Sequence, residues 1–252
     1  MTPRKQSSHM AQQATKQKGG FGETIRTVFY AVVIALFIRT FAYEPFSIPS
    51  GSMIPTLLVG DYLFVSKFSY GYSRYSLPFS PPLFEGRVFN GEPERGDVVV
   101  FKLPSDGATD YIKRVVGLPG DRVQMLNGIL HINGDAVERE EVGQLGVSGQ
   151  SVSVVRETLP DGSTHIIHER GHTGFYDNTQ VFNVPEGHYF MMGDNRDASQ
   201  DSRSSRVGYI PHDHLIGQAQ FLFFSHDGSA RMWEFWLWPQ SIRYGRIFDG
   251  IG

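Results

Sequence analysis

Ser52 is the first residue whose surroundings suggest chemistry. It lies between Gly51 and Met53 in the stretch EPFSIPSGSMIPTLLVGDYL, residues 44–63. Prolines keep this stretch extended and kinked, and Gly51 lets the backbone bend sharply beside the serine. The pattern suits either a nucleophile presented on a tight turn or an ordinary Ser/Gly turn. On this segment alone the ordinary turn is favoured, because such tripeptides are common.

Lys113 belongs to DYIKRVVGLPGD, residues 110–121, where apolar residues flank two adjacent cations. Side chains alternate between the two faces of a strand, so one of Lys113 and Arg114 must point toward the apolar side. A lysine in an apolar pocket loses its proton readily and can then act as a general base, whereas arginine cannot. On this segment alone, the prediction is that both cations are solvated.

A third segment, MMGDNRDASQDSR at residues 191–203, is dense in acidic and basic side chains. Asp197, Ser199 and Asp201 fit the first, third and fifth positions of a calcium loop. However, Ser202 replaces the required glycine and Gly208 replaces the final glutamate. We therefore expect a hydrogen-bonded support loop in which Asp201 pairs with Arg203 or Arg196. Histidines at 165, 168 and 172 lack partners for a metal site, so a hydrated hairpin is predicted there.

The elements that must position these residues begin with an apolar segment. Residues 21–43 are long enough to span a bilayer if the arginines near each end reach the interfaces. A cleavable signal peptide and a buried core helix are the alternatives. Residues 1–20 carry four cations and no acid, which predicts a flexible cytoplasmic tail, with everything after residue 43 exported.

The remainder of the 252-residue chain predicts a mainly β body. Short runs rich in Val, Ile, Phe and Tyr alternate with turn residues, and Asn-Gly pairs follow Leu126 and Ile132. Residues 69–95 suit an extended ribbon, and the more polar residues 124–185 suit an inserted second β domain. The absence of cysteine excludes a disulfide scaffold and a cysteine nucleophile, and a net charge of −3 disfavours nucleic-acid binding.

Taken together, the segments resemble the bacterial type I signal peptidases in order and in detail. The resemblance rests on Ser-Gly-Ser-Met-Ile-Pro-Thr-Leu from residue 50, GDVVVF from 96, YIKRVVGLPGD from 111, and GDNRD from 193 to Ser202-Arg203. It implies an all-β catalytic domain over 44–123 and 186–252, preceded by one transmembrane helix. The chain departs from better-studied members by having one such helix rather than two, and by Ala198 where asparagine is common.

The resemblance also implies roles for individual residues. Ser52 looks like the nucleophile and Lys113 like its general base, with the Ser50 hydroxyl and the Ser52 N–H forming the oxyanion hole. Ser199 looks like the residue that orients Lys113. The residues that look structural are Asp194, Arg196, Asp201 and Arg203.

The resemblance places the substrate as an added strand between two segments of the chain, residues 46–49 and 110–112. Small pockets there imply cleavage after Ala-x-Ala sequences. The implied substrate-binding residues are Phe46, Ile48, Pro49, Met53, Leu57, Asp110, Tyr111 and Ile112.

The implied partners are preproteins with signal peptides and the lipid bilayer. The tryptophan-rich residues 232–239 suit contact with the lipid headgroups, and packing of their rings on the β core is the alternative. We expect a monomer in the bacterial inner membrane, with its catalytic domain on the outer face and with no cofactor or metal. A self-cleaving Ser/Lys protein and a membrane-tethered, non-catalytic β-domain that binds partners are the alternatives.

Overall fold

The computed structural model describes residues 21–78, 80–82, 84–147, 149–231 and 233–252. The predicted basic tail, residues 1–20, and Met232 of the tryptophan-rich segment lie outside the described residues. The chain forms two compact units, one ending at Phe37 and one running from Ile38 to Gly252.

The N-terminal element is helix α1, Phe21–Phe41. It is long and apolar enough to cross a membrane, and none of its residues is buried. The prediction of one N-terminal apolar helix is therefore confirmed, and the alternative of a buried core helix is wrong. Glu23 in the first turn and Arg39 in the last turn complement the helix dipole.

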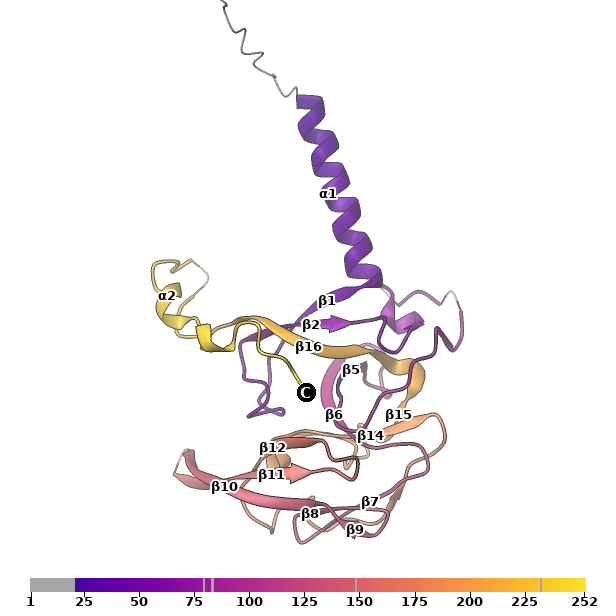
Figure 1. Cartoon of the computed structure of the whole chain (residues 1–252), viewed down its shortest axis with the longest axis vertical. Coiled ribbons are helices and arrows are strands. Elements are labelled where there is room, and N and C mark those ends of the chain that lie inside the picture. Colours follow the sequence, from indigo (N-terminus) through magenta and orange to yellow (C-terminus); the bar gives the residue numbers. More distant parts are fainter. Residues whose placement is uncertain (1–20, 79, 83, 148, 232) are drawn as a thin grey trace, which may run out of the picture. The chain divides into compact units, whose positions relative to one another are not determined.

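The second unit is built on a seven-stranded sheet whose neighbouring strands all pair antiparallel. Figure 1 labels its strands. In spatial order they are β1 (Tyr43–Ser47), β2 (Asp61–Ser66), β16 (Leu215–Ser225), β5 (Val98–Lys102), β6 (Asp110–Gly117), β14 (His188–Met192) and β15 (Ile210–Pro211).

Burial explains why these residues form these strands. Along β5, Val98 and Val100 belong to one core cluster, whereas Val99 and Phe101 belong to another. A strand buried on both faces needs an unbroken apolar run, which is what β5 carries. On β2 the residues alternate, so Leu63 is fully buried while its neighbours on the opposite face are half-buried.

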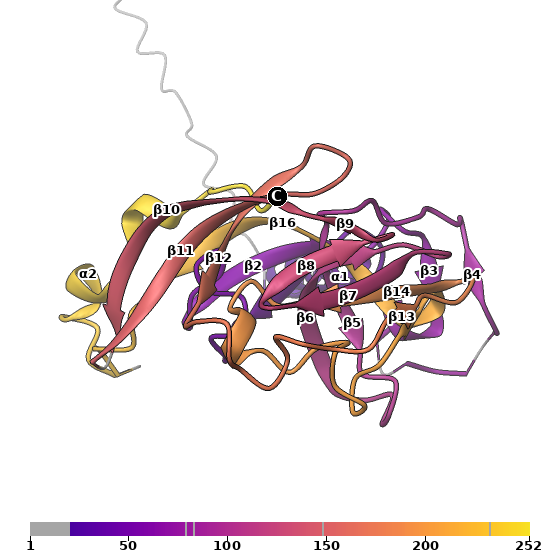
Figure 2. The same cartoon turned by 90° about the horizontal axis from the view of Figure 1, so that it is seen from below.

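The chain between β6 and β14 in the sequence forms two smaller sheets, whose strands are labelled in Figure 2. One contains β13 (Phe182–Asn183), β7 (Arg122–Leu126), β8 (Ile129–Ile132) and β9 (Asp135–Ala136); the other contains β10 (Glu138–Val147), β11 (Gln150–Thr158) and β12 (Thr164–Glu169). The Asn-Gly pairs at 127–128 and 133–134 all have positive φ, as tight hairpin turns require.

The inserted strands share a core with the large sheet. Val116 and Phe190 from β6 and β14 pack in one cluster with Met125, Leu130 and Leu159, which lie between these two strands in the sequence. Residues 38–252 accordingly form one compact unit.

The remaining elements are short. The ribbon predicted at 69–95 contains the paired strands β3 (Tyr72–Ser73) and β4 (Arg87–Val88). The short helices are η1 (Arg74–Ser76), η2 (Arg196–Ala198), η3 (His212–His214), α2 (Trp238–Ser241) and η4 (Tyr244–Arg246). The structure is thus mainly β with one long apolar helix, as the sequence predicts.

Candidate active site

Ser52 lies in the turns that follow β1, and its side chain points into the protein. The residue is 8% exposed. Its backbone is fixed by Asn195, whose N–H donates to the Ser52 carbonyl at 3.1 Å and whose Nδ2 donates to the Gly51 carbonyl at 2.9 Å. The turn is therefore held by a residue distant in sequence, unlike an ordinary solvated Ser/Gly turn.

Lys113 on β6 meets this serine. Its Nζ lies 2.6 Å from Ser52 Oγ and 2.8 Å from the carbonyl oxygen of Ile112. The lysine is 3% exposed. Burial lowers the pKa of Lys113 from 10.5 to about 8, against the opposing effects of Asp201 and Asp194. A lysine with this pKa can release its proton near neutral pH.

The neighbouring cation, Arg114, is buried as well, at 2% exposed. The prediction that both cations are solvated is therefore wrong. Arg114 forms a bidentate pair with Asp194, from Nε to Oδ1 and from Nη2 to Oδ2, both at 2.9 Å. Burial alone would raise the pKa of Asp194, but Arg114 outweighs it and holds that pKa below its usual value. Because Asp194 compensates the charge of Arg114, strand β6 can be buried on both of its faces.

The segment 191–203 does form a hydrogen-bonded loop. Asp201 accepts from Arg203 through both oxygens at 2.8 Å, which selects Arg203 over Arg196 as its partner. Burial raises the pKa of Asp201, but Arg203 and the Gly193 N–H lower it by more than burial raises it. The pKa of Asp201 is therefore below its usual value. Arg196 pairs instead with Glu157, a residue outside every motif that the sequence singled out.

Ser199 and Ser50 complete the surroundings of the dyad. Ser199 is 5% exposed, and its Oγ has no hydrogen-bond partner within geometric limits among the described residues, although it lies close enough to Asp201 to help lower that residue's pKa. The expected bond from Ser199 to Lys113 is thus not made in this structure. Ser50 is exposed, and its Oγ lies 3.4 Å from Ser52 Oγ.

A pocket of about 370 Å³ opens directly onto the dyad. It contains five of the predicted residues besides the dyad, Pro49, Ser50, Asp110, Tyr111 and Ile112, and two that sequence reasoning missed, Ala198 and Gln200. Both missed residues lie within the loop at 191–203, so their motif was a signal for them.

Three predicted substrate-binding residues lie deeper in the structure. Met53 and Leu57 are 0% exposed and pack with Ile48 in the core cluster that also contains Ile112. Phe46 packs against that cluster and is half-buried. Ile48, Met53, Leu57 and Phe46 are not part of the lining of this pocket.

The histidine-rich strand is not a hydrated hairpin, and that prediction is wrong. His165 and His168 are 6% and 8% exposed on β12, and only His172 is exposed. Among the residues that the structure describes, no group of three His, Cys, Asp or Glu side chains could hold a metal ion.

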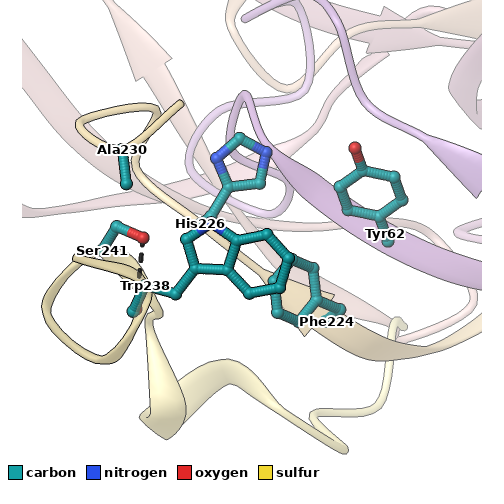
Figure 3. A pocket seen from close by; sticks show the side chains of 6 residues that line it. All are labelled: Tyr62, Phe224, His226, Ala230, Trp238 and Ser241. Atoms are coloured by element: carbon teal, nitrogen blue, oxygen red, sulfur yellow. Dashed lines mark hydrogen bonds between the residues drawn. The ribbon is translucent and has the colours of Figure 1, made fainter. Parts of the chain in front are cut away.

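A second pocket, of about 360 Å³, shares no lining residue with the pocket at the dyad and is mostly aromatic (Figure 3). The figure labels the rings of Tyr62, Phe224, His226 and Trp238, and the ring centroids of Tyr62, Phe224 and His226 lie 5.7 to 6.0 Å from one another. Nearby in sequence, Trp233 and Trp236 are 66% and 60% exposed. The pocket contains no predicted site residue.

Comparison with known proteins shows the family to which the chain belongs. The model of the family described as signal peptidase, peptidase S26, matches residues 21–224. A signal peptidase I of Rickettsia typhi (strain ATCC VR-144 / Wilmington) is 42% identical over 260 residues, covering 96% of this chain and 98% of its own. That of Rickettsia canadensis (strain McKiel) is 45% identical over 240 residues, covering 88% and 90%.

The crystal structure of a signal peptidase I from Enterococcus faecalis V583 covers 50% of this chain and 96% of its own, at 25% identity. Its TM-score of 0.31 is too low to support an argument about the fold. The family match and the curated relatives extend over most of the sequence and include the Ser52 and Lys113 segments. This chain belongs to the signal peptidase family, peptidase S26.

Proposed function

We propose that this member of a serine endopeptidase family removes N-terminal signal peptides from exported preproteins, with Ser52 as nucleophile and Lys113 as general base. The observation that carries the proposal is the 2.6 Å separation between Lys113 Nζ and Ser52 Oγ in a buried setting. With a pKa of about 8, roughly a tenth of the lysine is neutral at pH 7. That fraction suffices for a base that is regenerated in each turnover.

The reaction follows the logic of an acyl transfer through a covalent intermediate. Neutral Lys113 takes the proton of the Ser52 hydroxyl as Oγ attacks the scissile carbonyl. The lysine then passes this proton to the leaving amine, which releases the mature protein and leaves the signal peptide esterified to Ser52. Lys113 next activates a water molecule, whose attack frees the signal peptide and restores the serine.

Ser50 and the backbone of Ser52 are suited to stabilise the oxyanion. The Ser52 N–H donates to no group in the described part of the chain, so it is free to bind the developing charge. The Ser50 hydroxyl, 3.4 Å from Ser52 Oγ, can turn toward the same oxygen. Ser199 would orient Lys113 once its buried hydroxyl, unpartnered here, rotates toward Nζ.

Open strand edges support binding of the substrate as an extended segment. Residues 110–112 of β6 pair with β5, whereas β14 pairs only with residues 114–117 of β6. Strand β1 lies at the edge of its sheet and pairs with β2 alone. Between them, the pocket walls of Pro49, Tyr111 and Ile112 would admit small side chains, which fits cleavage after Ala-x-Ala.

The helix α1 would hold the enzyme in the inner membrane as a monomer, with its N-terminus cytoplasmic and residues 44–252 on the outer face. This topology places the dyad on the side where signal peptides are cut. We further propose that 44–123 and 186–252 form the catalytic domain around the inserted residues 124–185. The exposed aromatic rings at 233–238 would rest at the lipid headgroups.

The test is cleavage of a preprotein carrying an Ala-x-Ala site by purified full-length enzyme in detergent micelles. We expect wild type to cut after the second alanine, and Ser52→Ala and Lys113→Arg to lower kcat by at least about 10³-fold. Ser229→Ala, at an exposed serine, serves as the control. A wild type that binds but leaves the preprotein intact would favour the partner-binding alternative, and one that cuts only its own chain would favour the self-cleaving alternative.

A further inference from the structure

A buried ion pair joins the inserted strands to the loop beside the dyad. Glu157 on β11 is 0% exposed, and Arg196 at the start of η2 is 3% exposed. Arg196 Nη1 donates to Glu157 Oε1 at 2.8 Å, and Arg196 Nη2 donates to Oε2. His165, the cross-strand neighbour of Glu157 on β12, places its Nε2 3.5 Å from Glu157 Oε2.

The carboxylate of Glu157 stays ionised in this setting. Burial raises its pKa, but Arg196 and His165 outweigh burial and bring the pKa to about 2. A buried ion pair contributes little net stability compared with apolar residues of the same size. The value of such a pair lies more often in fixing one geometry, which directs attention to what Arg196 holds.

Arg196 is linked to the loop segment that surrounds Lys113. The Arg196 carbonyl accepts from Arg203 Nη2 at 2.7 Å, and the same guanidinium holds Asp201 through both oxygens. Asp201 in turn accepts from the Gly193 N–H at 3.1 Å. Arg196 is therefore linked to both ends of the 193–203 loop, and the two pocket residues Ala198 and Gln200 lie between those ends.

The same loop holds the nucleophile through the residue before Arg196. Asn195 donates to the carbonyls of Gly51 and Ser52. Strand β12 supports this segment from the other side, because the His168 N–H donates to the Asp194 carbonyl at 2.9 Å. The inserted sheet, the loop and the serine turn thus form one continuous hydrogen-bonded path.

We propose that Glu157 is a positioning residue for the Ser52–Lys113 dyad, acting by anchoring Arg196 and the 193–203 loop against the inserted strands. The inference rests on the proposed protease function and gives the inserted region a part in it. Glu157 touches neither dyad residue, and its effect passes through Arg196 and Asn195.

A loosened loop would change the surroundings of Lys113. The charged groups that act on this lysine are Asp201 and Asp194, and both depend on the loop for their placement. Loss of the anchor admits water to Nζ, so the pKa of Lys113 rises toward that of a solvated lysine. The kinetic pKa would rise and kcat would fall, whereas KM, set by the strand edges, would change little.

The experiment compares four variants of the full-length enzyme: Glu157→Gln, Arg196→Met, the double variant Glu157→Leu/Arg196→Met, and Glu140→Gln as control. Glu140 pairs with Arg156 in the same sheet, but both side chains face solvent, 69% and 47% exposed. The double variant replaces the pair with apolar groups, so it should fold where a single variant fails. The measurements are kcat and KM against pH on an Ala-x-Ala preprotein, thermal unfolding, and amide hydrogen exchange at Gly193 and Asn195.

We expect kcat to fall at least about tenfold in the three pair variants, with a raised kinetic pKa and faster amide exchange in the loop. The control should match wild type. A double variant that folds and keeps the wild-type kcat and kinetic pKa overturns the proposal, as does a loss of activity that only follows the folded fraction at an unchanged pH profile. If wild type does not cleave at all, the protease proposal fails, and the exchange rates alone then decide the positioning role.

Discussion

At the scale of single residues, the lowered pKa of Lys113 is explained by its burial and by the pairing of the nearby carboxylates with other cations. Its Nζ donates to a hydroxyl and a carbonyl oxygen and lies 5.4 Å from the centre of the Tyr111 ring. The two carboxylates that act on it are each held in a bidentate pair by an arginine, Asp194 by Arg114 and Asp201 by Arg203. Because those charges are already compensated, they oppose the effect of burial only weakly, and the pKa falls.

The lowered pKa has a consequence for stability that can be measured. The folded protein binds the Lys113 proton less tightly than the unfolded chain, whose lysine keeps a pKa near 10.5. This group therefore opposes folding below pH 8, and its unfavourable effect is lost as pH rises from about 8 to 10.5. Replacing Lys113 by methionine removes this unfavourable contribution, which amounts to at most about 3 kcal/mol of the free energy of folding at pH 7.

We accordingly expect Lys113→Met to unfold at higher urea concentration than wild type at pH 7, and this advantage to shrink toward pH 10. The measurement is chemical denaturation of the detergent-solubilised protein at several pH values. Lower stability of Lys113→Met at pH 7 would contradict the account of a buried, destabilising lysine.

Some residues of the site can be predicted from the sequence, and others cannot. Ser52 and Lys113 stand in recognisable motifs, and the structure brings them into contact. Glu157 could not be found in this way, because nothing in QSVSVVRET distinguishes a buried glutamate from a solvated one. The burial of Arg114 was missed because its partner, Asp194, is far away in the chain.

At the scale of elements, the close approach of three segments determines the site. Gly193, directly after β14, lies where the serine turn and the 193–203 loop meet: an added Cβ there would overlap Ser199 Oγ and the Ser52 carbonyl oxygen. A side chain at 193 must therefore displace either the nucleophile turn or the loop. Gly143 on β10 offers a contrast, since a Cβ there meets nothing within 4 Å.

We predict that Gly193→Ala lowers kcat/KM by at least about 10²-fold, because a shift of about 1 Å in a catalytic group can cost that much. The matched control, Gly143→Ala, should stay within about twofold of wild type. The kcat/KM of both variants is measured by steady-state kinetics on one preprotein, and circular dichroism shows whether the strands persist. Wild-type kinetics in Gly193→Ala would mean that the serine turn and the loop are less closely packed than described.

Element prediction succeeded where local rules decide and failed where tertiary contacts decide. The Asn-Gly turns and the apolar run of β5 follow from local chemistry. The strand β12 was misjudged because its histidines looked polar, whereas pairing with β11 and packing on the 194–197 segment bury two of them.

At the scale of the whole molecule, we expect the apolar helix and the second unit, residues 38–252, to have separable roles. The last turn of the helix belongs to the second unit and is bonded within it. Lys67 Nζ donates to the Arg39 carbonyl at 3.3 Å, and the Tyr72 hydroxyl donates to the Phe41 carbonyl at 2.5 Å. A shortened chain that begins at Ile38 keeps these contacts and the whole unit of residues 38–252.

We expect this shortened enzyme to cleave a short soluble peptide with a kcat/KM within about threefold of full length. On a preprotein inserted in lipid vesicles, its rate should fall by roughly 10²-fold, because it no longer shares the membrane surface with its substrate. Equal losses on both substrates would instead assign the helix a part in the active site.

In the proposed mechanism neutral Lys113 activates Ser52, and this step is measured by the pH dependence of kcat/KM for preprotein cleavage. We expect log kcat/KM to rise with a slope of about one as pH increases toward the pKa of about 8, and then to level off. A kcat/KM that stays constant from about pH 6 to about pH 9 would contradict the assignment of Lys113 as the base.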